Sequence, residues 1–317
     1  MERMRVAAVQ AAPVWMDREA TVAKVCRLIE QAAQGGARVV AFSETFVPGY
    51  PWWTSSDRLD LKALDVVTAR QSVYLRQGVD LARGDLDPVV EAARKSACFV
   101  ALGIAERAAT GGSLYCSLVL IDPTRGIVGV HRKLKPTYTE RVAWADGDAH
   151  GLRVHEHAGW RIGGLNCWEN WLPLPKFALY GQGEQLHVAT WPGGRGITLD
   201  ASRLVAIEGG VFVVSVSGLF DASLVPDDFP EARALRASLE GIALGDGGTL
   251  IVDPNGVVLA EAAANAEEIL YADLDLDVAL AARTLRDQGG HYHRPDLFEL
   301  RIDERRLGAT SSREPAR

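Results

Sequence analysis

Short apolar runs alternate along the chain with segments in which apolar residues recur every three or four positions. Such runs between turn residues are typical of buried strands, and the wider spacing is typical of helices that cover one face of a sheet. The pattern predicts strands at residues 4–10, 37–42, 99–105, 114–121, 127–130, 161–165, 185–190, 211–217, 249–252, 257–260 and 269–274. It predicts helical segments at residues 18–34, 54–83, 87–95, 174–180, 199–208 and 277–285, with Asp17 capping the first helix and Asp277 the last. This order predicts an α/β protein with mixed sheets.

Several predicted strands are joined by turns, and no stretch divides the chain. The turns at residues 122–126 and 254–256 each contain a proline and a glycine, so both predict β-hairpins. Residues 221–230 contain prolines and aspartates and predict a surface insertion. We expect a single domain over residues 1–302, followed by a disordered charged tail at residues 303–317.

Composition and charge narrow the class of partner. The chain has 317 residues, of which 48% are hydrophobic, and this supplies one large core. Its formal net charge is -7 and its Lys and Arg residues are dispersed, which gives no electrostatic footprint for nucleic acid or an anionic membrane. No apolar run reaches the roughly 18 residues of a membrane span, and the N-terminus does not resemble a signal peptide. We therefore expect a cytoplasmic protein whose partner is a small molecule.

The four cysteines divide into three core thiols and one candidate nucleophile. They form neither a CxxC motif nor a zinc-ligand spacing, which suits a reducing compartment. Cys26 lies within the first predicted helix, and Cys98 and Cys116 open or lie inside apolar strands, so we expect these three to be buried in the core. Cys167 instead follows a predicted strand at a polar turn. Because an unperturbed thiol is only about 3% ionised at pH 7, a nucleophilic cysteine needs a base or a cation nearby.

Two charged residues stand in positions like that of Cys167. Glu44 and Lys133 each come just after the end of a predicted strand, and α/β sheets place their ligands at strand ends. The sequence therefore predicts that Glu44, Lys133 and Cys167 share one site. A carboxylate base, an ammonium group and a thiol suit an acyl-transfer cysteine enzyme that needs no histidine.

The residues around these three positions resemble those of nitrilases, the nitrile-hydrolysing branch of the carbon–nitrogen hydrolase superfamily. The similarity covers nearly the whole chain, and the three long motifs occur in the family's order. The matching segments are GARVVAFSETFVPGYP at 36–51, HRKLKPTYTER at 131–141, GGLNCWENWLPLPK at 163–176, EQLHVATWP at 184–192 and HYHRPDL at 291–297.

The resemblance implies a fold, an assembly and a reaction. It implies an αββα sandwich of mixed sheets with outer helices, which pairs through homodimerisation or forms a higher homo-oligomer. It assigns Cys167 as the nucleophile, Glu44 as the general base, Lys133 as the cation that stabilises the tetrahedral intermediate, and Glu140 as a second, supporting carboxylate. The expected reaction converts a nitrile and water to a carboxylic acid and ammonia through a thioimidate and a thioester, with no metal or cofactor.

The chain departs from the commonest family pattern near the expected pocket. Tyr138 occupies a position where relatives often carry histidine, and the segment at residues 193–200 is shorter than in many nitrilases. The tail after Leu297 is also short, whereas relatives that form spiral filaments usually have a longer one. Aromatic residues near strand ends favour an aromatic-lined pocket over simple core filling for at least some of them. The candidate substrate-binding residues are Tyr50, Trp53, Tyr138, Trp168, Trp191 and Pro192.

Other interpretations remain open from sequence alone. The enzyme could act on cyanide or on an amide with the same residues, or the chain could be a catalytically silent binding or scaffold protein. Aliphatic, aromatic and arylacetonitrile substrates are equally compatible with the motifs. Glu140 has the alternative of a surface ion pair with Lys135 or Arg141. The histidine pairs 155/157 and 291/293 have a spacing that could hold a metal, but we expect them to be structural, and Arg294 and Asp296 to form an ion pair.

Overall fold

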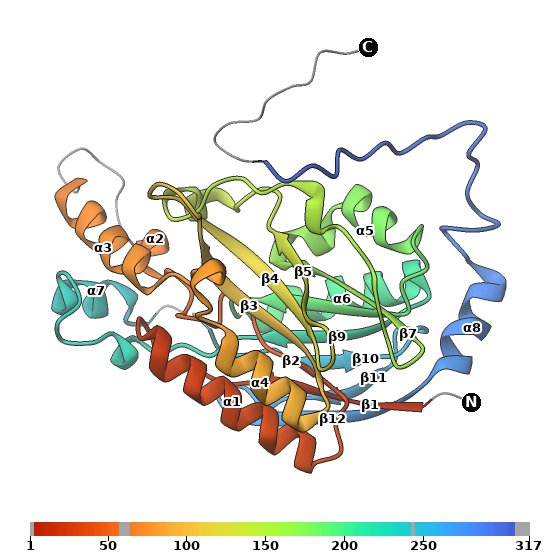
Figure 1. Cartoon of the computed structure of the whole chain (residues 1–317), viewed down its shortest axis with the longest axis horizontal. Coiled ribbons are helices and arrows are strands. Elements are labelled where there is room, and N and C mark those ends of the chain that lie inside the picture. The colour runs from red at the N-terminus through yellow and green to blue at the C-terminus, as the bar shows by residue number, and fades with distance from the viewer. Residues whose placement is uncertain (1–2, 57–63, 242–244, 308–317) are drawn as a thin grey trace.

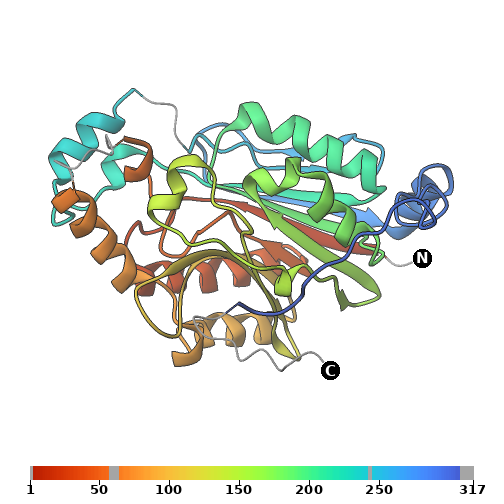
Figure 2. The same ribbon diagram turned by 90° about the horizontal axis from the view of Figure 1, so that it is seen from above.

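Two six-stranded sheets lie face to face in the computed structural model, which describes residues 3–56, 64–241 and 245–307 (Figures 1 and 2). The first sheet has the order β12 (Glu268–Asp275), β1 (Arg3–Gln10), β2 (Val39–Ala41), β3 (Phe99–Arg107), β4 (Leu114–Asp122) and β5 (Gly126–Arg132). The second has the order β11 (Val258–Glu261), β10 (Leu250–Val252), β9 (Phe212–Ser217), β8 (Leu186–Trp191), β7 (Trp160–Asn166) and β6 (His155–His157).

Both sheets are mixed, as predicted. Strands β1, β2 and β3 run parallel to one another, as do β7, β8 and β9. The two predicted hairpins, β4–β5 and β10–β11, are antiparallel. The first and last strands pair antiparallel, with Arg3 opposite Asp275 and Gln10 opposite Glu268.

Helices cover the outer face of each sheet, which completes the predicted αββα sandwich (Figure 2). Helices α1 (Arg18–Gln34) and α4 (Asp87–Ser96) cover the first sheet, and α5 (Pro173–Tyr180) and α6 (Arg195–Gly209) cover the second. Helices α2 (Trp53–Ser56), α3 (Leu64–Gln77) and α7 (Ala232–Leu239) gather at one end of the sandwich, and α8 (Leu276–Leu285) follows β12 (Figure 1). No described helix combines the length and the apolar character that a membrane crossing requires.

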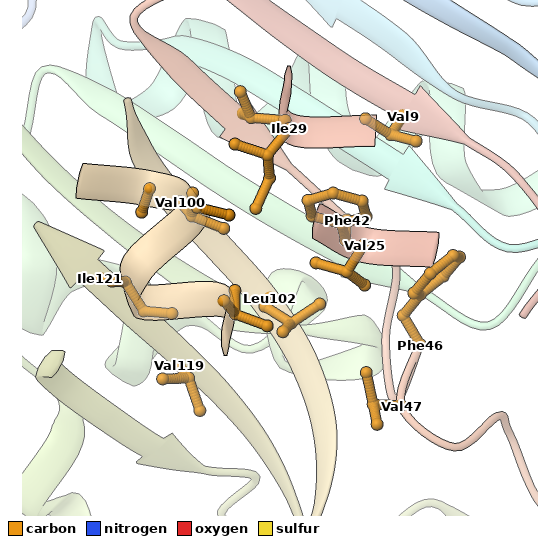
Figure 3. Packing of buried hydrophobic residues seen from close by; sticks show 14 of the residues in the cluster. Val9, Val25, Ile29, Phe42, Phe46, Val47, Val100, Leu102, Val119 and Ile121 are labelled. Carbon is orange, nitrogen blue, oxygen red and sulfur yellow. The ribbon is translucent and has the colours of Figure 1, made fainter. Parts of the chain in front are cut away.

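The core is layered because each helix presents one apolar stripe to a sheet. In α1, the Asp17 side chain accepts a hydrogen bond from the Ala20 N–H, and Val25 and Ile29 face inward on successive turns. These side chains pack against Phe42 and its neighbours on the first sheet (Figure 3). A second apolar layer fills the space between the sheets, and a third lies between the second sheet and α6.

The structure corrects several local predictions. Helix α8 is capped by Asp275, whose side chain accepts from the N–H of Asp277, so the cap lies two residues earlier than predicted. Helix α6 begins at Arg195, four residues before the predicted start. Cys26 is only partly buried, because it lies at the margin of the α1 apolar stripe.

Residues 221–230 lie mostly at the surface, as predicted, but they also contribute two residues to the core. Val225 and Phe229 are buried in an aromatic cluster that includes Trp15 and Trp53, and α7 follows them. The sequence pattern did not reveal these two core residues, because prolines and aspartates dominate the segment and the partners of Val225 and Phe229 lie far away in the sequence.

Two further predictions fall partly outside the described residues. Of the helical segment at 54–83, residues 57–63 are not described, and of the expected tail, residues 308–317 are not described. Residues 303–307 have no regular secondary structure, and Arg306 donates to Asp148 Oδ1 at 3.1 Å.

Candidate active site

Four chemically reactive side chains converge where strands of the two sheets end. Glu44 follows β2, Lys133 follows β5 and Cys167 follows β7, while Glu140 lies in the short 3-10 helix η2 (Tyr138–Val142). Oxygen atoms of Glu44 and Glu140 and the sulfur of Cys167 all lie within 4.8 Å of one another. The structure thus brings together the three residues that the strand ends suggested and Glu140, which the motif similarity suggested.

Lys133 lies between the two carboxylates. Its Nζ donates to Glu44 Oε1 at 2.9 Å and to Glu140 Oε2 at 2.7 Å, and all three side chains are buried. Burial by itself would lower the pKa of Lys133, but nearby Cys167, Glu44 and Glu140 raise it well above its ordinary value. The ammonium group therefore supplies the positive charge that two buried carboxylates require.

Two glycines make room for the backbone that carries these charges. A Cβ at Gly103 on β3 would lie 2.1 Å from the Ser43 carbonyl oxygen and 2.8 Å from the Glu44 Cα. A Cβ at Gly147 would lie 2.4 Å from the Lys133 carbonyl oxygen. Since backbone atoms cannot yield as a flexible side chain does, both positions require glycine if Glu44 and Lys133 are to keep their places.

Glu140 is held by three hydrogen bonds. Its Oε2 accepts from the Thr137 N–H at 2.6 Å as well as from Lys133, and its Oε1 accepts from the Tyr50 hydroxyl at 2.8 Å. The alternative surface ion pairs are absent from the described residues, because Lys135 pairs with Asp146 and Arg141 donates to a carbonyl oxygen.

Glu44 has one occupied and one unoccupied oxygen. Oε1 accepts from Lys133 and from the Cys116 thiol, at 3.3 Å, whereas Oε2 is buried without a hydrogen-bond partner among the described residues. Burial raises the pKa of Glu44 to about 7, against the lowering effect of Lys133, and the charge of Glu140 adds to the rise. A carboxylate with a pKa near neutrality and a free oxygen can both take up and release a proton.

Cys116 is buried in the core, as predicted, and its thiol also donates to Glu44 Oε1. It lies on β4, beside the end of β5, and its carbonyl oxygen accepts from the Lys133 N–H at 2.7 Å. The sequence places Cys116 on β4, the hairpin partner of the strand that ends at Arg132. It does not tell which face of β4 is turned toward the site, so the contact with Glu44 could not be predicted.

Cys167 begins a short 3-10 helix, η4 (Cys167–Trp171), with its backbone in the left-handed region at φ 46°. A residue with a Cβ in this region carries strain of about 1–3 kcal/mol, which the surroundings must offset. Burial raises the pKa of the Cys167 thiol well above its ordinary value, although Lys133 acts to lower it. The thiol is therefore protonated in the resting site and needs the nearby base.

Glu169 ties the two strand ends together and was not singled out from sequence. Its carboxylate accepts from the Asn166 N–H at 2.9 Å, next to Cys167, and from the Leu134 N–H at 2.8 Å, next to Lys133. His131 Nε2 lies 3.0 Å from the same group. The backbones that carry the nucleophile and the cation are thus bonded to one buried side chain.

The predicted pocket residues differ in their burial and in their contacts with the reactive side chains. Tyr50 reaches the site through Glu140, and Trp168 adjoins Cys167 with 46% of its surface exposed. Trp191 is fully buried beside Cys167 and donates to Ser215 Oγ, and Pro192 follows it. Tyr138 is 82% exposed at the start of η2. Trp53 is fully buried and packs in the aromatic cluster with Tyr74 and Phe229.

The histidines have separate partners. His157 Nδ1 lies 3.1 Å from Asp122 Oδ2, and neither predicted pair joins a cluster of possible metal ligands within the described ranges. Arg294 and Asp296 form the predicted ion pair at 2.6 Å. Glu44, Glu140 and Cys167 do have the spacing of metal ligands, but the Lys133 ammonium already contacts both carboxylates.

Sequence relatives cover almost the whole chain. An aliphatic nitrilase from Rhodococcus rhodochrous is 37% identical over 96% of this chain and 80% of its own length. A nitrilase from Pseudomonas syringae pv. syringae is 38% identical over 94% of this chain and 89% of its own length. An arylacetonitrilase from Aspergillus niger is 35% identical over 96% and 90% of the two chains.

Solved structures share the fold at lower identity. A carbon–nitrogen hydrolase from Helicobacter pylori G27 superposes with a TM-score of 0.66 at 20% identity, over 90% of this chain and 93% of that one. An amidase from Nesterenkonia sp. AN1 superposes with a TM-score of 0.61 at 16% identity, over 89% and 95% of the two chains. The sequence profile described as carbon-nitrogen hydrolase matches residues 5–284. With this match and relatives above 30% identity, the chain belongs to the carbon–nitrogen hydrolase family.

Proposed function

We propose that the protein is a nitrilase that hydrolyses an organic nitrile to the carboxylic acid and ammonia. The observation that carries this proposal is the buried group of Glu44, Lys133, Glu140 and Cys167, with a base oxygen left free and a cation beside it. The names of the relatives favour nitriles over amides as the substrate class. Roles for the individual residues follow from their contacts.

In the first half of the reaction, Glu44 Oε2 takes the proton of the Cys167 thiol while the sulfur attacks the nitrile carbon. A C–S bond forms, one bond of the C≡N triple bond opens, and the nitrogen receives the proton to give a thioimidate. Lys133 stabilises the negative charge that develops on the nitrogen, since its ammonium group is fixed before the reaction begins.

In the second half, water adds to the thioimidate carbon and gives its proton to Glu44. Proton transfer to the nitrogen lets ammonia leave, and a thioester remains on Cys167. A second water molecule, deprotonated in the same way, attacks the thioester, and the carboxylic acid leaves as the thiol is re-formed. Both halves use Glu44 as acid and base, which suits a pKa near 7.

The test is product stoichiometry across a panel of aliphatic, aromatic and arylacetic nitriles, the matching amides, and cyanide. One ammonia and one acid per nitrile consumed are expected, with amide as a minor product. If the tetrahedral intermediate expels the thiol instead of ammonia, amide results. Because Glu140 lies beside the Lys133 ammonium, Glu140→Gln should raise the amide share. Amide as the main wild-type product, or turnover of amides or cyanide alone, would contradict the proposal.

We also propose that the protein acts as a homodimer or higher homo-oligomer in the cytoplasm. Exposed apolar side chains on the outer helices, Leu174 on α5 and Leu204 and Ile207 on α6, support self-association. All four cysteines are free, which suits a reducing compartment. Light scattering should give at least twice the chain mass, and Leu204→Glu should lower it if α6 lies in the interface.

A further inference from the structure

Behind the nucleophile, three buried side chains form a chain of hydrogen bonds that no step above uses. Asn170 Nδ2 donates to the Cys167 carbonyl oxygen at 2.9 Å. Asn170 Oδ1 lies 2.8 Å from His187 Nε2 on β8, and His187 Nδ1 lies 2.9 Å from Glu184 Oε1. Asn170, His187 and Glu184 are each fully buried. Their sequence positions, in η4 and at the start of β8, gave no sign of this connection.

The positions of the hydrogens in these three hydrogen bonds follow from the group at one end, the Cys167 carbonyl oxygen. A carbonyl oxygen only accepts, so the Asn170 NH₂ must face Cys167, and Asn170 Oδ1 must accept from His187 Nε2. His187 therefore carries a proton at Nε2, and its short contact with Glu184 needs a further hydrogen between Nδ1 and Oε1. The pair holds that proton either as imidazolium and carboxylate or as neutral imidazole and carboxylic acid.

The hydrogen bond from Asn170 fixes the orientation of the peptide between Cys167 and Trp168. A trans peptide is planar, so its N–H points away from its carbonyl oxygen. Asn170 holds the carbonyl on one side, and on the other the Trp168 N–H lies toward the Cys167 sulfur, where its hydrogen bond lowers the pKa of the thiol. Cys167 itself has a φ of 46°, a strained value for a residue with a Cβ, so the backbone around this peptide needs support from its surroundings.

We propose that Asn170, His187 and Glu184 are positioning residues that fix the peptide between Cys167 and Trp168, so that the Trp168 N–H faces the reacting sulfur. The three residues contact the nucleophile only through its backbone. They act on the reaction by keeping one donor aimed at the sulfur, in a conformation that the backbone alone does not favour.

The sulfur also faces ionisable groups that the proposal leaves in place. These are Lys133 at the end of β5, Glu44 after β2, Glu140 in η2 and, beside Glu140, Tyr50. On the far side, Glu184 lies within electrostatic reach of Arg283 and Tyr180. A change confined to Asn170, His187 or Glu184 therefore tests the donor at Trp168 while the four groups around the sulfur stay constant.

The first test measures the rate of Cys167 alkylation by iodoacetamide against pH, read by mass spectrometry of the peptide that contains Cys167. His187→Leu removes the donor to Asn170, so the thiol should ionise at higher pH and alkylate more slowly at neutral pH. The matched control is His157→Leu, which removes another buried histidine from its carboxylate partner, Asp122. Its alkylation profile should equal that of the wild type.

A second pair of variants covers the case in which His187→Leu does not fold. In Glu184→Gln, the side-chain amide can donate to His187 Nδ1, so the direction of the chain is kept and the profile should stay near that of the wild type. Glu184→Met offers no hydrogen and should behave like His187→Leu. Rescue by Gln but not by Met is a result that a purely space-filling role would not give.

Turnover provides a separate measurement, and only this part rests on the proposed nitrile hydrolysis. His187→Leu and Glu184→Met should lower kcat by about tenfold, the effect of one lost hydrogen bond to the reacting group, with KM little changed. An unchanged alkylation profile in folded His187→Leu or Glu184→Met would overturn the proposal, as would an equal shift in His157→Leu. Altered alkylation without nitrile turnover in the wild type would reject the proposed substrate class alone.

Discussion

The two sheets support the same site in different ways. On the first sheet, Glu44 and Lys133 hold each other through an ion pair at 2.9 Å, so the groups proposed for acid–base chemistry are also each other's support. On the second sheet, Cys167 is held through its backbone, by the Asn170 amide and by the Glu169 bridge at Asn166. On the first sheet, the reactive side chains therefore also hold the site in place. On the second sheet, the reactive sulfur and the groups that hold its backbone are different atoms.

This difference predicts how each half tolerates change. Removing the buried charge of Lys133 leaves the charges of its carboxylate partners uncompensated. Removing the Cys167 sulfur breaks none of the hydrogen bonds that hold the backbone of Cys167, so the surrounding structure should be unchanged. The two sheets also meet directly at the site, since the Glu44 N–H donates to the Trp191 carbonyl oxygen at 3.3 Å. Distortion that begins in one half can consequently reach the other.

The largest expected contrast lies between Lys133→Met and Cys167→Ala. Both should reduce ammonia release to background, because one removes the cation and the other the nucleophile. Lys133→Met should also lower the free energy of unfolding by about 3–5 kcal/mol, since Glu44 and Glu140 lose their shared partner. Cys167→Ala should stay within about 1 kcal/mol of the wild type. Denaturant unfolding measures the loss of stability in each variant. Equal destabilisation of the two variants would contradict the proposed difference between the two sheets.

Gly103→Ala should damage the first half without altering any reactive group. The added methyl would overlap backbone atoms of Ser43 and Thr45, so Glu44 must move. A displacement of about 1 Å at a catalytic group can cost about 100-fold in rate, and we expect a loss of that order in kcat. Gly112→Ala is the control, because the nearest atom to its added Cβ is a Leu75 side-chain carbon at 3.8 Å. Equal activity of the two variants would contradict the steric account.

The pH dependence should report Glu44. Because Glu44 must be ionised to accept the thiol proton, kcat/KM should rise with pH through a value near 7 and fall as the carboxylate is protonated below it. The Cys116 thiol lowers the pKa of Glu44, so Cys116→Ala should move this limb to higher pH. Cys98→Ala, which removes a buried thiol bonded to the Ala37 carbonyl oxygen, should leave the limb where it is. If the pH at which kcat/KM rises is the same in Cys116→Ala as in the wild type, the Cys116 thiol does not influence the pKa of Glu44 in the reaction.

The smallest expected effect concerns substrate choice. Trp168 is half-exposed beside Cys167, so Trp168→Ala should change the relative rates of bulky and small nitriles by about tenfold, the scale of a lost apolar contact. Trp53 packs against Trp15 and Tyr74 in the aromatic cluster, so Trp53→Phe should lower stability and leave selectivity unchanged. A competition assay with paired nitriles distinguishes these outcomes.

The sequence was informative where function sits at the ends of apolar runs. Glu44, Lys133 and Cys167 could be placed together because runs of buried residues locate strand ends, and motif similarity added Glu140. The contact between Cys116 and Glu44 and the chain from Glu184 to Asn170 could not be read, because they depend on which face of each strand meets which neighbour.

Loops and aromatic residues were harder to predict for a related reason. Tyr50 and Trp53 are three positions apart, yet one bonds Glu140 at the site and the other fills a core cluster. A turn sets their directions, and its path is fixed by contacts with residues far along the chain. Phe229, in a segment read as a surface insertion, is one of those contacts.

The pairing of β1 with β12 sets a condition on how the protein is made. During synthesis, β1 can pair with β2 early, and β2 with β3, but the other edge of β1 has no partner until residues 268–275 leave the ribosome. An unpaired strand edge is a template for association with other chains. The protein should therefore complete its first sheet only after translation has passed residue 275, and nascent chains released before that point should aggregate unless a chaperone covers β1.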